Sequence, residues 1–180
     1  MKRLLVTLLL CAVARPAAAQ TGPSAGAPPG GVAAARPQYE EAKDNLLRSA
    51  DEMPEESYGF RPTAAVRSFG QIIGHLAGSH EAFCGAALGT PRPESAAYEK
   101  LTSKAELVAV LRKSFEMCDR AYSISDAAAA APIRMFGQDM TLLGVLIMNI
   151  GHDNLHYGNL VTYMRMKGLV PPSSQPRPAS

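Results

Sequence analysis

Apolar residues recur at helical spacing in four separate segments of this 180-residue chain, and this spacing limits the fold more than any other feature. Residues 38–53 carry one apolar stripe with charges elsewhere, as an amphipathic helix does. The stripe consists of Tyr39, Ala42, Leu46 and Ala50. No segment alternates convincingly between apolar and polar residues, so we expect no strands. The sequence therefore predicts an all-α fold, a four-helix bundle. Its other three helices are expected at 68–88, 103–122 and 141–167.

Local signals predict where these helices begin and end. The quartets "SFGQ" at Ser68 and "SKAE" at Ser103 each fit a capping box, in which a serine caps the first turn and a Gln or Glu three residues later returns the hydrogen bond. Pro54 ends the first helix, and Gly168 with the prolines after it ends the last. The stretch "SISDAAAAAPIRMFGQDM" before the last helix predicts a connection with one short helical turn at most.

Glycines recur every four residues in the second helix, at Gly70, Gly74 and Gly78. A glycine costs up to about 1 kcal/mol relative to alanine inside a helix. The row therefore indicates that another backbone comes close to this face. We expect the helix at 141–167 to be that neighbour.

The N-terminal residues 1–19, "MKRLLVTLLLCAVARPAAA", predict a secretory signal peptide. They combine a basic start, an apolar core and a small-residue exit, with cleavage expected before Gln20. The apolar run is too short for a permanent membrane anchor, and Leu10 directly before Cys11 argues against a lipid anchor. We therefore expect an exported protein, periplasmic or secreted.

The segments on either side of the predicted bundle have compositions that do not support a core. Residues 20–37 are rich in Gly, Pro and Ala and predict a flexible tether. Residues 173–180 predict a loose C-terminal tail. The bundle is therefore expected to occupy residues 38–172.

The charge balance gives no reason to expect a nucleic-acid partner. The chain has 18 Lys and Arg against 16 Asp and Glu, but Lys2, Arg3 and Arg15 belong to the predicted signal peptide. The 15 basic residues that remain roughly balance the 16 acidic ones. This is not the electrostatic footprint of a nucleic-acid binder.

The four histidines are the residues that point to chemistry. His152 and His156 stand four apart in an apolar helical run, so they share one helix face, with Cβ atoms about 5–6 Å apart. A buried imidazole without a partner costs roughly 1–3 kcal/mol, whereas two imidazoles can converge on one metal ion. His75, on the glycine-lined side of the second helix, is the best candidate for a third ligand. His80 lies about 140° further round that helix, so we expect it near the surface or in a helix contact.

Spacing alone leaves the alternative of ordinary core histidines open, but other catalytic motifs fit less well. No Glu stands three residues before a His, as a di-iron bundle requires. The stretch "HEAFC" begins like a zincin motif but has Cys84 where the second His belongs. Haem-attachment, nucleophile-elbow and phosphate-loop motifs are missing from the sequence. Catalytic residues stay unassigned, and Glu81 is not placed convincingly as a general base.

Three segments, "YGFRPTAAVRSFGQIIGHLAGSH", "FEMCDRAY" and "GHDNLHYGNLVTYMRMKGLVPPSS", together resemble the DinB/YfiT-like family. The resemblance covers about residues 39–174. It implies a four-helix bundle with a divalent metal held by three histidines, one on the second helix and two on the fourth. By match, these are His75, His152 and His156. The family often has Gln where Asn159 stands, at a position that is not a ligand.

Three neutral nitrogen ligands would leave positions for water or substrate, as in catalytic metal sites. Zinc and nickel both suit imidazole. Asn149, Asp153 and Asn159 are candidates for hydrogen bonds to the ligands, although we expect Asp153 to serve in capping or at the surface.

Relatives in this family imply two classes of function. Several use the metal to activate a low-molecular-weight thiol, but that chemistry needs a cytosolic thiol pool, which an exported protein would lack. We therefore expect a metal-dependent hydrolase or transferase of an unknown small substrate. The alternative is a non-catalytic bundle that binds metal or a partner, and an exchangeable water on the metal would distinguish the two.

The resemblance also implies association through helix faces, as a homodimer. Gly144, Gly151 and Gly158 recur every seven residues and fit such a face. The alternative, which the sequence favours, is that these glycines serve packing between the second and fourth helices.

Cys84 and Cys118 are the two cysteines outside the predicted signal peptide. An even count in an exported protein favours pairing, and relatives with one of these cysteines often carry the other. Antiparallel helices would hold them apart, but the linker "GTPRPESAAYEKLT" is long enough for the third helix to start elsewhere. We predict a disulfide, with two buried thiols as the alternative.

Overall fold

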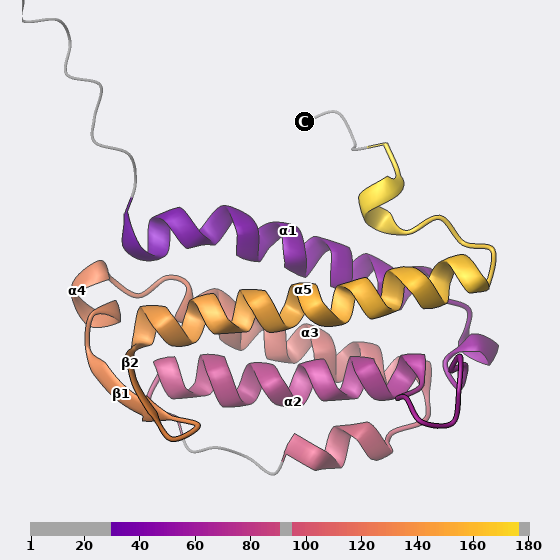
Figure 1. Ribbon diagram of the computed structural model, residues 1–180, viewed down its shortest axis with the longest axis horizontal. Helices are drawn as coiled ribbons and strands as arrows, with labels where there is room; N and C mark the ends of the chain where they lie inside the picture. The colour runs from indigo at the N-terminus through magenta and orange to yellow at the C-terminus, as the bar shows by residue number, and fades with distance from the viewer. Residues whose placement is uncertain (1–29, 91–94, 177–180) are drawn as a thin grey trace, which may run out of the picture.

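Four long helices form the protein, and a small hairpin folds against one end of them (Figure 1). The structure, a computed structural model, describes residues 30–90 and 95–176. Apart from the hairpin its regular elements are helical, so the predicted four-helix bundle is confirmed. In chain order the elements are α1 (Gly31–Glu52), η1 (Glu55–Ser57), α2 (Phe69–Ala87), η2 (Ser95–Lys100), α3 (Lys104–Ala121), α4 (Asp126–Ala129), β1 (Pro132–Met135), β2 (Gln138–Thr141), α5 (Leu142–Met166) and η3 (Pro172–Ser174).

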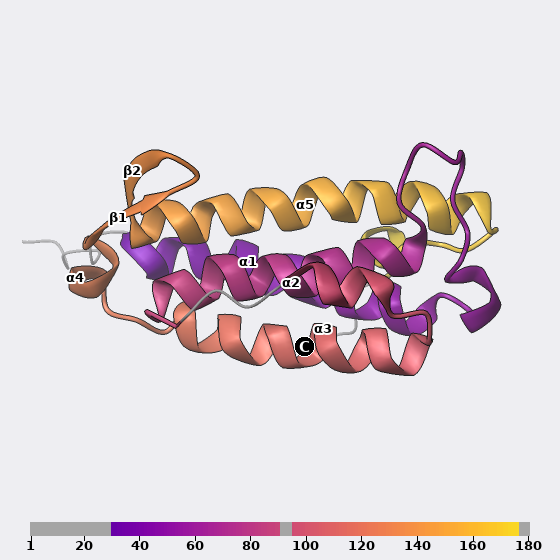
Figure 2. The ribbon, with the colours of Figure 1, turned by 90° about the horizontal axis from the view of Figure 1, so that it is seen from below.

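The order of the helices around the bundle differs from their order in the chain. α2 packs against α3 and α5, and α1 packs against the same two helices. Figures 1 and 2 show α1 and α5 running in one direction and α2 and α3 in the other. α2 and α3 can run in the same direction because η2 returns along α2 to the end where α2 began.

The parallel course of α2 and α3 brings Cys84 and Cys118 to the same end of the bundle. The two cysteines form a disulfide, with their Cα atoms 5.0 Å apart. The predicted bridge is therefore confirmed, and it joins the helix that carries His75 to its neighbour.

The core runs along the bundle axis and contains several large aromatic side chains. Tyr39 of α1 stacks on Tyr122 at the end of α3, with ring centroids 3.9 Å apart. The Tyr39 hydroxyl donates a hydrogen bond to Asp119 Oδ1 at 2.6 Å. Burial is the main reason that the pKa of Tyr39 lies far above its usual value. The stack therefore stays neutral and ties α1 to α3.

α1 begins at Gly31, earlier than the predicted start at Gln38, and Pro37 lies inside it. The additional turns are held by a distant residue. Asp126 Oδ1 of α4 accepts a hydrogen bond from the Val32 N–H at 2.9 Å, and Val32 is buried. The composition of residues 20–37 predicted a tether because it carries no sign of this contact with a residue distant in the sequence. Residues 1–29, with the predicted signal peptide, lie outside the described part of the chain.

The expectation of no strands was wrong. β1 and β2 pair antiparallel, with Ile133 opposite Met140. Phe136 and Gly137 connect them, and both have positive φ, 50° and 77°. This is the backbone of the tight two-residue turns that match the twist of a hairpin. The strands were missed because each has only four residues and neither shows a clear apolar alternation.

Gly74 faces η2, and Gly70 faces Leu107 of α3 and the Tyr58 carbonyl, so the neighbour of these two α2 glycines is not α5 as expected. A Cβ at Gly74 would collide with the Tyr98 carbonyl of η2, and a Cβ at Gly70 would lie 3.2 Å from the Tyr58 carbonyl. On α5, no described atom lies within 4 Å of a Cβ built at Gly151 or Gly158. These α5 glycines therefore do not serve packing against α2.

Residues 173–176, the described part of the loose tail expected at 173–180, pack against the bundle. η3 packs on the end of α1, and Gln175 Nε2 donates to Glu52 Oε2 at 2.7 Å. Residues 177–180 lie outside the described part. Among the helices of residues 30–90 and 95–176, none is long and apolar enough to cross a membrane.

Candidate metal centre

The three histidines that the sequence singled out as ligands lie together. His75 projects from the middle of α2, and His152 and His156 project from adjacent turns of α5. One ring nitrogen from each of the three lies within 4.8 Å of the other two. His75 Nε2 and His152 Nε2 are 3.1 Å apart. The helical spacing on α5 and the contact of α2 with α5 produce this cluster.

The geometry of the cluster suits a divalent ion. Two imidazole nitrogens that each lie about 2.1 Å from one ion are roughly 3 Å apart. The observed Nε2–Nε2 separation of 3.1 Å is of this size. All three side chains of the cluster are imidazoles, the donors that zinc and nickel bind well. The residues present therefore fit a metal.

Their surroundings keep two of these histidines neutral. Burial, together with repulsion from His156 and His75, lowers the pKa of His152 to about 3. Burial likewise lowers the pKa of His156 to about 4, with contributions from His75 and Arg67. Neutral imidazole is the form that binds a metal, so at neutral pH no proton needs to leave these rings.

Glu99 of η2 fixes the orientation of His75. Its Oε1 lies 2.9 Å from His75 Nδ1, and Arg67 Nε donates to its Oε2 at 3.0 Å. Burial opposes ionisation of this carboxyl group, but the hydrogen bonds from Arg67 and His75 hold its pKa below the usual value. An ionised Glu99 accepts a hydrogen bond from His75 Nδ1–H and leaves the Nε2 lone pair of His75 directed at the cluster. A carboxylate–histidine pair of this kind commonly supports a metal ligand.

Of the three residues considered as hydrogen-bond partners of the ligands, Asn159 contacts one. Its side-chain nitrogen lies 3.4 Å from His156 Nδ1. Asn149 instead donates to Asp153 Oδ2 at 2.9 Å, deep in the bundle. Asn159 therefore lies where it can orient His156, and Asn149 belongs to a different network.

His80 and Asp153 form that separate network, which confirms the helix contact expected as one of two places for His80 and corrects the expectation for Asp153. His80 is fully buried, not near the surface, and it bridges Ser114 Oγ and Asp153 Oδ1 at 2.9 Å each. Asp153 is fully buried as well and neither caps a helix nor faces solvent. The expected separation of His80 from the candidate ligands is nevertheless observed, because the two α2 histidines point to different sides. His80 holds α2, α3 and α5 together.

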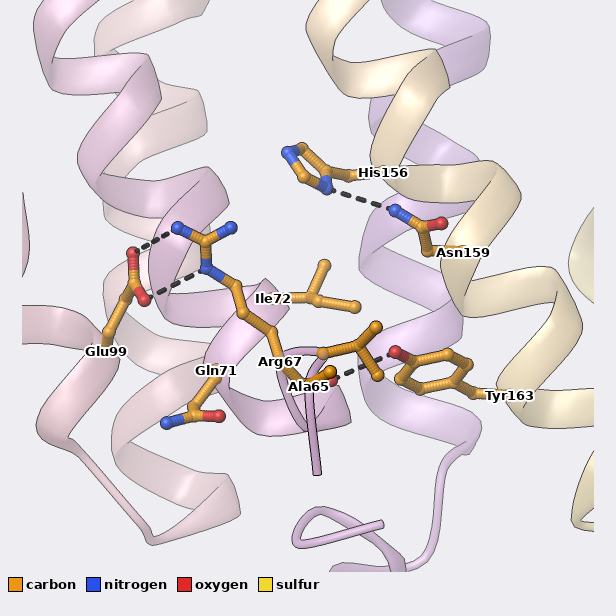
Figure 3. A pocket seen from close by; sticks show the side chains of 9 residues that line it. Ala65, Arg67, Gln71, Ile72, Glu99, His156, Asn159 and Tyr163 are labelled. Atoms are coloured by element: carbon orange, nitrogen blue, oxygen red, sulfur yellow. Dashed lines mark hydrogen bonds and ion pairs between the residues drawn. The ribbon is translucent and has the colours of Figure 1, made fainter. Parts of the chain in front are cut away.

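A polar pocket of about 580 Å³ opens beside the cluster (Figure 3). Its charged and polar lining comes from Arg67, Gln71, Glu99, His156 and Asn159. Figure 3 shows one edge of the Arg67 guanidinium on Glu99 and the other edge facing the side of His156. A small polar molecule can therefore reach the histidines and meet a positive charge there.

Glu99 and Arg67 were missed as parts of the site. Arg67 directly precedes the α2 cap, and Glu99 lies in a linker between two predicted helices, with no motif of its own. Glu99 reaches His75 because η2 packs along the glycine face of α2, and Arg67 joins the site through Glu99. That glycine row was the available signal, because it indicated a close backbone. Glu81 accepts a hydrogen bond from the Tyr98 hydroxyl at 2.7 Å and lines neither this pocket nor the cluster.

Comparison with known proteins shows which other proteins share this fold. The sequence profile of the DinB superfamily matches residues 38–160. A DinB-like protein from Bacillus cereus ATCC 10987 is similar, with a TM-score of 0.70 and 19% identity over 79% of this chain and 96% of its own. No curated protein matches this chain.

Two further solved structures share the fold. YfiT from Bacillus subtilis, described as a probable metal-dependent hydrolase with an unusual four-helix bundle topology, has a TM-score of 0.61 and 15% identity over 77% of this chain and 88% of its own. A mycothiol-dependent maleylpyruvate isomerase has a TM-score of 0.62 and 17% identity over 72% of this chain, but this match spans only 60% of the isomerase. At such identities these likenesses show the fold, and together with the profile match they show that the chain belongs to the DinB superfamily.

Proposed function

We propose that the protein binds one divalent metal ion through His75, His152 and His156 and uses it to hydrolyse a small substrate or transfer a group from it. The observation that carries this proposal is the convergence of three histidine nitrogens within 4.8 Å, beside a pocket of about 580 Å³. The probable metal-dependent hydrolase among the similar structures supports the same class of activity. Three nitrogen ligands leave coordination positions for water or substrate.

The chain's own residues would position the substrate around the ion. A bound divalent ion would polarise a carbonyl or phosphoryl oxygen, or activate water, at the open positions. Glu99 holds His75 in the tautomer that directs Nε2 at the ion. The free edge of the Arg67 guanidinium and the Asn159 amide face the pocket and can hold a polar group of the substrate.

We propose zinc or nickel as the ion, because three imidazoles and no carboxylate in the cluster suit these borderline metals better than magnesium or calcium. Metal content measured on protein purified without added metal tests this choice.

We also propose that the protein is exported and that residues 1–19 are removed. The support is the signal-like N-terminus and the Cys84–Cys118 disulfide, which suits an oxidising compartment. Fractionation of cells that express the full chain should recover the protein outside the cytosol, with Gln20 as its first residue. Recovery in the cytosol with an intact N-terminus would contradict export.

Elemental analysis of purified variants tests the metal site. The wild type should contain one metal ion per chain, and His152→Ala should contain almost none. His80→Ala is the matched control, since it removes another histidine of α2 that faces away from the cluster, and it should keep the metal. Full metal retention in His152→Ala would overturn the ligand assignment.

A screen of small ester, amide and phosphoester substrates, with and without chelator, tests the activity. Turnover that chelator removes and metal restores supports the enzyme. Metal at full occupancy without an exchangeable water would instead support a non-catalytic metal-binding bundle.

A further inference from the structure

The β1–β2 hairpin brings an aromatic side chain to the candidate metal centre. Phe136, at the tip of the hairpin, packs on Phe83 of α2 with ring centroids 5.8 Å apart. Phe83 in turn lies 5.5 Å from the His152 ring. Figures 1 and 2 show the hairpin folded back beside the first turns of α5 and the end of α2. The hairpin tip therefore lies near the candidate metal centre, with Phe83 between Phe136 and His152.

A second pocket, here called the hairpin pocket, lies between Phe136 and the candidate ligands. It has a volume of about 220 Å³. His75 and His152 line it on one side, and Ala82, Phe83 and Phe136 form its apolar wall. An apolar cavity of about 150 Å³ takes a benzene molecule, so this pocket has room for a ring-sized group directly beside two of the three candidate ligands.

The backbone conformation at Phe136 is one that a turn does not favour for phenylalanine, so the turn does not explain this residue. Its φ of 50° is in the left-handed region, where Asn, Asp and Gly are preferred and a bulky side chain is unfavourable. The side chain is 58% exposed, so it contributes little to the core. Its described aromatic contact is Phe83, at the wall of the hairpin pocket. An aromatic residue that suits neither the turn nor the core fits a role in binding.

The two pockets are lined by different histidines of the cluster. His156 lines the polar pocket with Arg67 and Asn159, whereas His75 and His152 line the hairpin pocket. Glu99 lines both. A ligand bound at the open positions of the ion would therefore meet polar groups on one side and aromatic carbon on the other.

We infer that the substrate carries an apolar group about the size of a phenyl ring next to its metal-binding polar group, and that Phe136 determines this preference. The inference rests on the proposed function, because it assigns the apolar half of the same site. The hairpin pocket receives the ring, and the polar pocket receives the rest of the molecule.

Binding of two hydroxamates to the cobalt-loaded protein tests the inference. Acetohydroxamate and benzohydroxamate share one metal-binding group and differ in the ring, and the visible spectrum of Co²⁺ reports their binding. In Phe136→Asn the preference for benzohydroxamate over acetohydroxamate should fall about fivefold, the size of one aromatic contact. The Kd of acetohydroxamate should stay within about twofold, and the thermal midpoint should be unchanged or higher, because Asn suits the turn.

Three further variants complete the test. Phe136→Tyr keeps the ring and should keep the preference for benzohydroxamate. Leu155→Ala removes an exposed apolar side chain of α5 that lines neither pocket, and this variant should also keep the preference. Phe136→Gly gives the same answer if the Asn variant does not fold. An unchanged preference in Phe136→Asn or Phe136→Gly would overturn this inference alone. A failure of Co²⁺ to bind, or of both hydroxamates to change its spectrum, would instead overturn the proposed function.

Discussion

At the scale of single residues, α2 carries two histidines five positions apart that do different work. His75 faces the candidate metal centre with one nitrogen on Glu99 and the other toward His152. His80 has both nitrogens in hydrogen bonds inside the bundle, to Ser114 and Asp153. A histidine whose two nitrogens are both engaged in the core has no lone pair left for a metal. The difference lies in the partners that the fold supplies.

Replacing His80 should therefore weaken the fold and leave the metal centre in place. In His80→Ala the Asp153 carboxylate keeps its hydrogen bond from the Asn149 amide but loses the buried imidazole that it contacts. Removing one partner of a buried pair costs about 3–5 kcal/mol, so the free energy of unfolding in urea should fall by roughly that much while the metal content stays the same. The double variant His80→Leu/Asp153→Leu should recover part of the loss, because no buried charge remains. A double variant less stable than His80→Ala would contradict this coupling.

The low pKa values of His152 and His156 give the metal-free protein a specific pH dependence. Both are near 3 to 4 in the folded protein and near the usual 6.5 when unfolded. Unfolding therefore takes up protons below pH 6.5, so stability is complete above that pH and is lost as pH falls toward 4. Each histidine should contribute up to about 1.4 kcal/mol per pH unit in this window.

Urea unfolding in chelator at pH 6.5, 5.5 and 5.0 measures this slope. The variant His152→Gln/His156→Gln keeps every other titrating group, so the difference between its slope and that of the wild type reports these two rings. Equal slopes in the two proteins would contradict the low pKa values. Added metal should raise stability without flattening the wild-type slope, because the ligands of a bound ion carry no protons and still take them up on unfolding.

At the scale of elements, the helix ends that depend on neighbouring residues could be predicted from the sequence. The helix ends that depend on distant residues could not. α2 begins after Ser68, whose hydroxyl caps Gln71 while Gln71 returns the bond, as its four-residue pattern predicts. α5 begins after Thr141 and is followed by Gly168 at φ 76°, close to the predicted bounds. The start of α1 was not predictable, because it depends on Asp126, 94 positions away.

The same distinction applies to the candidate site. The α5 pair follows from helical spacing, and His75 follows from its place in mid-helix together with the family pattern. Glu99 and Phe136 come from a linker and a hairpin tip, where no periodicity relates a side chain to its neighbours. Glu99 reaches His75, and Phe136 lines a pocket with His75 and His152, only once η2 and the hairpin have packed onto the bundle.

The disulfide between α2 and α3 should stabilise the bundle substantially. It closes a loop of 34 residues, for which the chain-entropy argument gives about 4 kcal/mol. The variant Cys84→Ser/Cys118→Ser should lose roughly that much free energy of unfolding and keep its metal, since neither cysteine belongs to the cluster. Alkylation followed by mass spectrometry should label two more cysteines after reduction than before. Equal labelling before and after reduction would mean that the bridge does not form in the isolated protein.

At the scale of the whole molecule, chain order and spatial order differ because two connections cross the bundle. Among the four long helices, α2 follows α1 in the chain and α5 follows α3, but neither pair is adjacent around the bundle. This arrangement sets α5 between α1 and α2, so one side of α5 carries the histidines toward α2 while its outer side stays open. The outer side holds Ile147, which is 55% exposed, and Leu155, which is 65% exposed.

We predict that this outer face of α5 pairs with its copy in a homodimer. The open positions at Gly151 and Gly158 would let a second helix approach closely, and Ile147 and Leu155 would lose their exposure to water. In a two-fold interface each of these residues is used twice, so Leu155→Lys places two charges in the contact and should raise the dimer dissociation constant at least about tenfold. Sedimentation equilibrium over a range of concentrations measures it. Val170→Lys, at an equally exposed apolar residue beyond the end of α5, should leave the dimer intact. A wild type that stays monomeric at the highest concentration would rule the interface out and leave the α5 glycines without a role in assembly.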